Sequence, residues 1–256
     1  MIAWEIVTTV HKTLKKLAII GAKLSDLDKV AEKIVLDNGG TCYNKGYKGG
    51  ADWPKDQKPK KPFPNALVVN VNSCIVHGRP TDYILRNSDV VSFDIGVKKD
   101  GLCGDGGFTM GIGQIENKNA RLMYYAKRAL YIGIEQVKAG ANVKDISRAI
   151  ELYIIKNGYV VNERFGGHGI GKEMHEDPNV PNFTSSLFKD YILKEGQMIC
   201  IEPIVTFKDI SGMQVDDWAW VTRDGKASVF FEHQIRVEKN GATILTDHID
   251  KDELFY

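Results

Sequence analysis

Short apolar runs recur along the chain, and three of them carry a single carboxylate at or near their end. The runs are Val90-Val-Ser-Phe-Asp94, Met198-Ile-Cys-Ile-Glu-Pro203 and Ser228-Val-Phe-Phe-Glu-His233. Continuous apolar segments of this length are typical of buried β-strands. The pattern therefore predicts three strands in which Asp94, Glu202 and Glu232 lie against buried surface.

The first of these strands is followed by a predicted β-hairpin over residues 94–105. Its turn falls at Lys99-Asp100-Gly101, a sequence that suits a tight reversal between two strands. Folding back at this turn brings Asp105 alongside Asp94. The two carboxylates would then be placed on neighbouring strands, where they could chelate the same ion.

A different periodicity, that of amphipathic helices, occurs twice. Residues 21–39 align without gaps on residues 140–158, and six of the nineteen positions are identical. Both copies end at Asn-Gly, which is a helix-stop signal. The shared helix face is apolar in both: Leu24, Leu27, Ala31, Ile34 and Val35 in the first copy, and Val143, Ile146, Ile150, Tyr153 and Ile154 in the second.

A repeat with so long a period is not a solenoid unit. It predicts two similar half-domains, roughly residues 1–115 and 116–256, within a single domain of residues 1–256. Packed about a pseudo-twofold axis, they would form an α+β fold with a central antiparallel sheet covered by helices and a cleft between the halves. The alternative is a pair of unrelated amphipathic helices with similar caps.

Five side chains are candidates for one metal site: Asp94, Asp105, His168, Glu202 and Glu232. Taken singly, each acid would be interpreted as a solvated edge charge or a turn former. Buried charges, however, are normally paired or bound to metals. Four carboxylates and one neutral imidazole carry a formal charge of −4, which two divalent cations would balance. The oxygen-rich donor set suits Mn, Fe, Co or Zn, and glycines around His168 leave room for close approach to the backbone.

The amino-acid composition indicates a globular protein and argues against several other classes. The 256 residues are 43% hydrophobic with a net charge of +1, which describes an ordinary globular chain. The four cysteines form no CxxC pair, so neither a zinc module nor a disulfide framework is expected, and Cys103 and Cys200 are interpreted as small buried hydrophobes. No apolar run reaches the roughly 18 residues of a membrane span, and no signal peptide is recognisable. We expect a cytoplasmic protein that binds neither DNA nor membranes.

The motifs around the five candidates resemble the type I methionine aminopeptidases, a family with the pita-bread fold. The resemblance runs from about Thr13 to the C-terminus. It is carried by Asn72-Ser-Cys-Ile-Val-His-Gly-Arg-Pro80, Asp94 with Gly104-Asp105, Gly167-His-Gly-Ile-Gly-Lys-Glu-Met-His-Glu-Asp-Pro178, Ile201-Glu-Pro203 and Phe231-Glu-His233. Only 30 positions separate Glu202 from Glu232 (232 − 202 = 30), which leaves no room for the long insertion of the type II branch.

The resemblance implies both a site and a reaction. Asp94, Asp105, His168, Glu202 and Glu232 would hold two divalent cations, with Asp105 and Glu232 bridging them. The reaction would be cotranslational removal of the initiator methionine from nascent polypeptides whose second residue is small, by a metal-activated water. Glu202 would shuttle the proton, His175 would donate to the scissile carbonyl, and His77 would contact the amide nitrogen of the cleaved bond.

The implied methionine pocket consists of Phe63, Met174 and Trp218, with Trp220 as a competitor for the last place. Two positions depart from the family near the last glutamate ligand: Phe230 replaces a usual glutamine and Gln234 a usual threonine. Such neighbours of a metal ligand can tune metal affinity or rate.

Other expectations concern partners and rival functions. Residues 45–61 hold six lysines against two aspartates and are interpreted as a solvated basic loop or, alternatively, as a transient contact with ribosomal RNA. The resemblance implies a monomer. Two rival functions stay open: an Xaa-Pro peptidase, whose familiar forms carry a large additional N-terminal domain, and an inactive pita-bread binding protein, which would have lost ligands.

Overall fold

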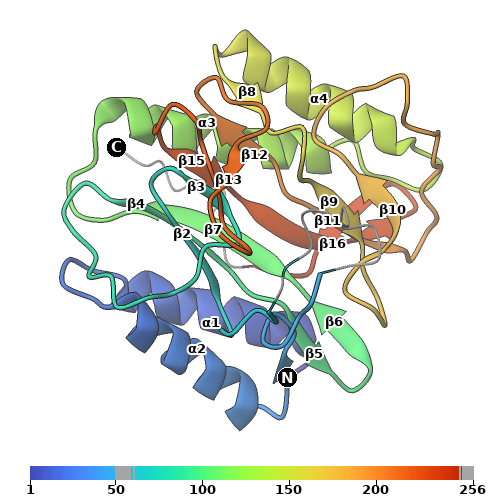
Figure 1. The fold of residues 1–256 in the computed structure, drawn as a ribbon. Helices are drawn as coiled ribbons and strands as arrows, with labels where there is room; N and C mark the ends of the chain where they lie inside the picture. Colours follow the sequence, from blue (N-terminus) through green and yellow to red (C-terminus); the bar gives the residue numbers. More distant parts are fainter. Residues whose placement is uncertain (50–58, 60, 248, 250–256) are drawn as a thin grey trace.

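The computed structural model describes residues 1–49, 59, 61–247 and 249, and an eight-stranded sheet flanked by two pairs of helices is its largest element (Figure 1). The helices are α1 (Ala3–Leu17), α2 (Leu24–Asp37), α3 (Asn117–Ile134) and α4 (Val143–Lys156). The strands are β1 (Thr41–Cys42), β2 (Val68–Val71), β3 (Cys74–Val76), β4 (Val90–Asp94), β5 (Val97–Lys99), β6 (Leu102–Gly104), β7 (Gly106–Gly111), β8 (Val160–Val161), β9 (Gly167–Gly169), β10 (Glu176–Val180), β11 (Met198–Ile201), β12 (Ile204–Thr206), β13 (Met213–Gln214), β14 (Trp220–Val221), β15 (Ser228–Phe230), β16 (Glu232–Glu238) and β17 (Gly241–Ile244).

The large sheet has the order β10-β9-β11-β16-β7-β4-β2, with β17 added to β16. All of its neighbouring strands are antiparallel. In Figure 1, α1 and α2 lie together at the bottom of the molecule, and α3 and α4 lie together at the top. The predicted α+β fold, a central antiparallel sheet with helices outside it, is confirmed.

The predicted hairpin over residues 94–105 is confirmed as well. Its strands β5 and β6 are antiparallel: Val97 lies opposite Gly104, and Lys99 lies opposite Leu102. Asp100 and Gly101, the two residues of the turn, have φ of 50° and 78°. Positive φ at both positions matches the twist of the flanking strands in a two-residue hairpin turn.

The predicted strand over residues 228–233 is in fact two strands that belong to different sheets. β15 pairs with β12 in a smaller sheet, whereas β16 begins at Glu232 and pairs with β11 and β7. Similarly, β11 ends at Ile201, so Glu202 follows that strand rather than lying within it. In both places a candidate ligand stands where the strand pairing changes.

The helical repeat corresponds to real structural symmetry. α2 and α4 begin 119 residues apart and end 119 residues apart (143 − 24 and 156 − 37). The residues that precede them, Lys23 and Asn142, form equivalent isolated β-bridges with Ile84 and Ile192. The two half-domains are therefore related by pseudo-symmetry, while the boundary proposed near residue 115 stays a prediction.

A second internal repeat, which the helix periodicity did not reveal, extends this symmetry to the sheet. Residues 82–85 and 190–193 share the sequence Asp-Tyr-Ile-Leu, at a spacing of 108 (190 − 82). Each segment hydrogen-bonds through its backbone to the first residue of α2 or α4. At the same spacing, Asp94 corresponds to Glu202 (202 − 94 = 108). Two of the candidate ligands are thus symmetry-related.

The apolar core lies between the helices and one face of the large sheet. Side chains of α1, among them Ile6 and Leu14, are fully buried in the same cluster as Phe93 of β4 and Phe108 of β7. Side chains alternate between the two faces of a strand. The neighbours of these two phenylalanines, Asp94 and Gly107, therefore face away from the helices.

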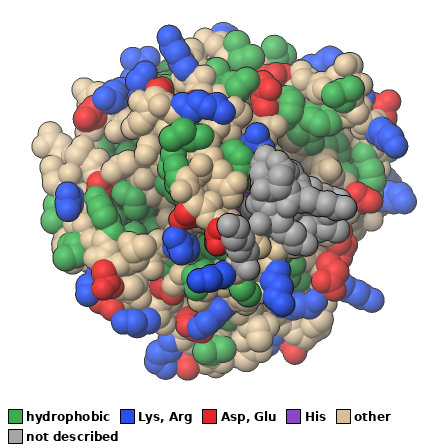
Figure 2. Space-filling model, viewed as in Figure 1, with side chains coloured by type: hydrophobic (Ala, Val, Ile, Leu, Met, Phe, Trp, Pro, Cys, Tyr) green, Lys and Arg blue, Asp and Glu red, His purple; other side chains and the backbone are tan. Residues whose placement is uncertain are grey.

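On the face shown in Figure 2, basic and acidic side chains are interspersed. Among the described residues, no helix combines the length and the apolar character needed to cross a membrane. Of the lysine-rich segment, residues 50–58 and 60 lie outside the described residues, so the idea of a ribosome contact rests on sequence alone.

Replacement of Asp28 should test how α2 is fixed to the sheet. This buried carboxylate accepts the backbone N–H groups of Ala66 and Leu67 at 3.0 and 2.8 Å and the Asn65 amide at 2.8 Å. Asp28→Ala leaves these buried donors without their acceptor, so we expect a loss of about 3 kcal/mol in the free energy of unfolding, measured with urea. Asp26→Ala, which removes an exposed acid of the same helix, should cost less than about 1 kcal/mol; equal losses would contradict the assignment.

Candidate metal centre

Cross-strand register places three of the candidate ligands in one row on the sheet face opposite the helices. Asp94 lies opposite Gly107 in the β4–β7 pair, and Gly107 lies opposite Glu232 in the β7–β16 pair. The β11–β16 register, continued one residue past the end of β11, puts Glu202 at the level of Glu232. Residues directly opposite each other in antiparallel strands share a face. Asp94, Glu232 and Glu202 therefore project from one row.

A second row, two residues along the strands, contains the remaining candidates. Gln234 lies opposite Cys200, and the β11–β9 register puts Cys200 beside His168. Asp105, just before β7, donates its backbone N–H to Oε1 of Gln234 at 3.2 Å. The order across the sheet is thus Asp105, Gln234, Cys200 and His168, on the same face as the first row.

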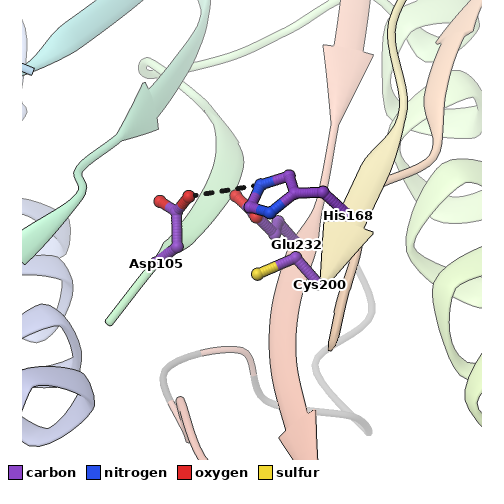
Figure 3. A group of neighbouring side chains, drawn as sticks. All are labelled: Asp105, His168, Cys200 and Glu232. Carbon is purple, nitrogen blue, oxygen red and sulfur yellow. Dashed lines mark ion pairs between the residues drawn. The ribbon is translucent and has the colours of Figure 1, made fainter. Parts of the chain in front are cut away.

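Side chains from the two rows converge. Nε2 of His168 lies 3.6 Å from Oδ2 of Asp105 and 4.0 Å from Oε1 of Glu202. Figure 3 shows Asp105, His168, Cys200 and Glu232 around one space, and their ligand atoms all lie within 4.8 Å of one another. All four residues are buried. The structure thus brings together residues from four segments that are distant in the chain.

His168 is held in the orientation that a metal ligand needs. Its Nδ1 lies 2.9 Å from the carbonyl oxygen of Gly169, an acceptor to which Nδ1–H donates, so the lone pair is on Nε2, facing the carboxylates. The glycines on either side of His168 have no side chain, so the backbone of neighbouring segments can pack closely against them. A Cβ at Gly167 would lie 2.1 Å from the Cys200 carbonyl oxygen, and one at Gly169 would lie 2.2 Å from that of Asp177.

Burial and mutual repulsion dominate the electrostatics of the site. Burial, followed by the charges of Asp105 and Glu202, raises the pKa of Asp94 well above its usual range, and the same causes act on Glu232. Burial likewise raises the pKa of Glu202 to about 7, against the lowering effect of His168. Burial alone would lower the pKa of His168, but Asp105 and Glu202 raise it on balance. In the metal-free protein these carboxyl groups therefore keep their protons at pH values where exposed acids are ionised.

The two histidines expected to contact substrate lie next to this cluster. The ring of His175 is 4.5 Å from the ring of His168, centroid to centroid. His77 follows β3 with a φ of 57°, and its ring lies 6.1 Å from that of Trp218. Burial lowers the pKa of both His77 and His175 to about 4. Both imidazoles are therefore neutral at physiological pH.

The residues proposed for the methionine pocket fall into two apolar clusters. Phe63 and Trp218 pack edge-to-face at 5.2 Å and share a cluster with Val68. Met174 lies in another cluster with Cys103 and Cys200. The competitor Trp220 lies in a third, beside Phe230 and under the guanidinium of Arg164. Of the two tryptophans, Trp218 is thus the one placed beside Phe63 and His77.

Several residues at the site had no role assigned from the sequence. Tyr43 and Tyr47 flank His175, with ring centroids 6.2 and 6.0 Å from it. Both come from the segment after β1, for which no motif exists. Cys200 is buried in an apolar cluster, as expected for a small hydrophobe, but its sulfur also lies within 4.8 Å of the ligand atoms. Its position between Gln234 and His168 depends on the register of three strands, which no local pattern specifies.

Comparison with known proteins assigns the chain to a family. A profile of metallopeptidase family M24 matches residues 2–239. The chain belongs to this family. Methionine aminopeptidase 1 of Bacillus subtilis strain 168 is 33% identical over 249 residues, which are 95% of this chain and 93% of that protein. The methionine aminopeptidase of Helicobacter pylori strain 26695 is 34% identical over 231 residues, covering 89% and 86%.

Solved structures of M24 members agree with this assignment. The crystal structure of methionine aminopeptidase from Rickettsia prowazekii matches with a TM-score of 0.86 at 28% identity, covering 95% of this chain and 94% of that one. The resemblance to methionine aminopeptidases and the pita-bread fold are thereby confirmed. A prolidase from Pyrococcus horikoshii matches with a TM-score of 0.74 at 22% identity, but the match covers only 61% of the prolidase and shows a shared fold alone.

Membership in a metallopeptidase family indicates what the buried cluster could bind. The chain is a metallopeptidase, and hence a hydrolase, that uses divalent metal ions. The buried cluster of Asp105, His168 and Glu232 offers oxygen and nitrogen atoms that could bind such an ion.

The stability of the metal-free protein should depend on pH through Glu202. Its pKa of about 7 in the folded state exceeds the usual 4.5. The folded state therefore keeps this proton longer than the unfolded chain, and stability is lost as pH rises from 4.5 to about 7. Glu202→Gln stays neutral throughout, so at pH 8 we expect it to exceed the wild type by about 3 kcal/mol in free energy of unfolding after chelator treatment.

The same comparison at pH 4 should show no such advantage, because both side chains are then neutral. The exposed Glu195, replaced by Gln, serves as a control whose curve should follow the wild type. Parallel curves for wild type and Glu202→Gln between pH 4 and pH 8 would contradict the electrostatic description of the site.

Proposed function

We propose that this M24 peptidase removes the N-terminal methionine of polypeptides whose second residue is small, using two divalent cations. The observation that carries the proposal is the pair of adjacent rows, on one sheet face, that gathers four carboxylates and one imidazole. The sequence similarity to methionine aminopeptidases supports methionine as the residue removed.

The donor set fits divalent cations. Burial and mutual repulsion disfavour the ionised form of these carboxyl groups, and a nearby positive charge stabilises that form. Asp94, Asp105, His168, Glu202 and Glu232 would hold the ions. One nitrogen among oxygen donors suits Mn, Fe, Co or Zn. When bound, the ions would lower the pKa of a water molecule and polarise the scissile carbonyl.

The chain's own side chains would move and hold protons around the reacting bond. Near neutral pH, Glu202 would accept a proton from the attacking water and deliver it to the leaving amine. His175 is neutral at that pH and can donate a hydrogen bond to the carbonyl oxygen as negative charge develops there. His77 would contact the amide nitrogen of the same bond.

An apolar, aromatic pocket would select methionine. Phe63 and Trp218 are almost completely buried and pack against each other, and Trp218 lies beside His77. A thioether gains favourable contacts with aromatic edges and fills irregular apolar space. Met174, on the side of the cluster formed by Cys103 and Cys200, would close the other end of the pocket.

The proposal extends to the cellular setting of the protein. We infer that the protein acts on nascent chains in the cytoplasm as a monomer, and that Lys45–Lys61 contacts the ribosome transiently. These inferences rest on the resemblance and on the lysine content of that segment.

Cleavage of short peptides tests the proposal directly. Chelator-stripped protein, re-supplied separately with Mn, Fe, Co or Zn, should release methionine from Met-Ala-Ser and leave Ala-Pro-Ser intact, as measured by chromatography of the products. No release should occur without metal. Cleavage of Ala-Pro-Ser instead would move the chain to the Xaa-Pro peptidases. Folded protein that binds metal but cleaves neither peptide would be a binding protein.

A matched pair of tryptophan variants tests the methionine pocket. Trp218→Leu should raise KM for Met-Ala-Ser, because a large aromatic contact next to the substrate is removed, and kcat/KM should fall about tenfold or more. Trp220→Leu makes the same change in side-chain size at a position that packs against Phe230 and Ile75. Its main effect should therefore be on thermal stability. Equal effects of both variants on KM would refute the assignment of Trp218.

A further inference from the structure

Cys200 is the least expected member of the ligand cluster. Its sulfur lies within 4.8 Å of ligand atoms on Asp105, His168 and Glu232. Figure 3 shows the side chain pointing into the space that these three surround. The thiol is also placed to hydrogen-bond to the carboxylate of Glu232. The residue is fully buried, so its thiol contacts the site and not solvent.

The direction of this side chain is fixed by the sheet. Cys200 lies in the same row as Asp105 and His168, between Gln234 and His168, because of the antiparallel registers of β11 with β16 and β9. Cys103 is equally buried and belongs to the same apolar cluster, but its Sγ is directed to the carbonyl oxygen of Lys172. Burial alone therefore does not explain why the sulfur of Cys200 joins the ligands.

We propose that Asp105, His168, Cys200 and Glu232 form a four-donor site for a single thiophilic divalent cation such as Zn²⁺ or Cd²⁺. One sulfur, one nitrogen and two oxygens are a donor set that such ions accept in tetrahedral geometry, with bonds of about 2.0 to 2.3 Å. Donors at these lengths are roughly 3.3 to 3.8 Å apart, so the side chains here need to close by only about 1 Å. Sulfur favours these ions over Mn²⁺ or Mg²⁺.

Binding in this mode is a ligand exchange without a redox step. One metal–sulfur bond forms, the S–H bond of Cys200 breaks, and the proton passes to the buffer. Asp94 and Glu202 take no part. Three of the four donors are shared with the catalytic ions of the proposed function, on which this consequence rests. A thiophilic ion with four protein donors leaves no open position and would therefore hold the enzyme in an inactive form.

Absorption spectroscopy of the metal-loaded protein tests the sulfur contact without any peptide substrate. Chelator-stripped protein is titrated with Cd²⁺ and, separately, with Co²⁺, whose thiolate complexes show ultraviolet ligand-to-metal charge-transfer bands. We expect these bands in the wild type and in Cys103→Ser, the matched control. Cys200→Ser should lack them and bind Cd²⁺ at least about tenfold more weakly, while its Mn²⁺ affinity changes by less than about threefold.

Two further measurements keep the test decisive. Cys200→Thr, a second variant without sulfur, is included in case Cys200→Ser folds poorly, and circular dichroism checks the fold of each variant. Wild-type protein that gives no thiolate band with either ion, or a band that persists without Cys200, would overturn the proposal. The peptide assay with Mn²⁺ is independent of this result. An enzyme that cleaves Met-Ala-Ser but gives no thiolate band would refute the four-donor site and leave the proposed function intact.

Discussion

Repulsion among carboxylates on one sheet face is the constraint on which the rest of this structure depends. Two like charges about 4 Å apart cost on the order of 4 kcal/mol near a protein surface, and here Asp94, Asp105, Glu202 and Glu232 gather within two rows. Among the described ion pairs of these four acids, the only partner is His168. The sheet must therefore be rigid enough to hold together acids that repel one another whenever they are ionised, and whose pKa values are raised as a result. Its opposite face, packed on the helices, supplies that rigidity.

The sequence was sufficient to predict the elements that are encoded locally. The hairpin before Asp105 follows from a turn whose residues tolerate positive φ, and the helices from their apolar spacing. The same is true of the pseudo-symmetry of α2 and α4, which shows directly as a repeated sequence. Motifs around Asp94, His168 and Glu232 were enough to propose them as neighbours, because each acid or imidazole stood out from an apolar or glycine-rich surrounding.

Features that depend on the pairing of distant strands could not be predicted. The split at Phe231 arises because β15 and β16 join different sheets, although their residues form one apolar run. Cys200 points to the ligands only through the register of β11 with two partners. Phe230 is a further case: its ring occupies the space that a Cβ of Gly107 would need, 2.2 Å away. The ring of Phe230 is thus accommodated by the glycine between Asp94 and Glu232.

The meeting of β7 and β16 in the middle of the sheet has a consequence for how the protein matures. Asp94 and Glu232 are 138 positions apart in the chain (232 − 94), yet they become neighbours across this junction. A growing chain exposes Asp94 and Asp105 long before His168, Glu202 and Glu232 have been synthesised. In the proposed site, tight ion binding would therefore be a late event of biogenesis that requires the two halves of the sheet to have joined.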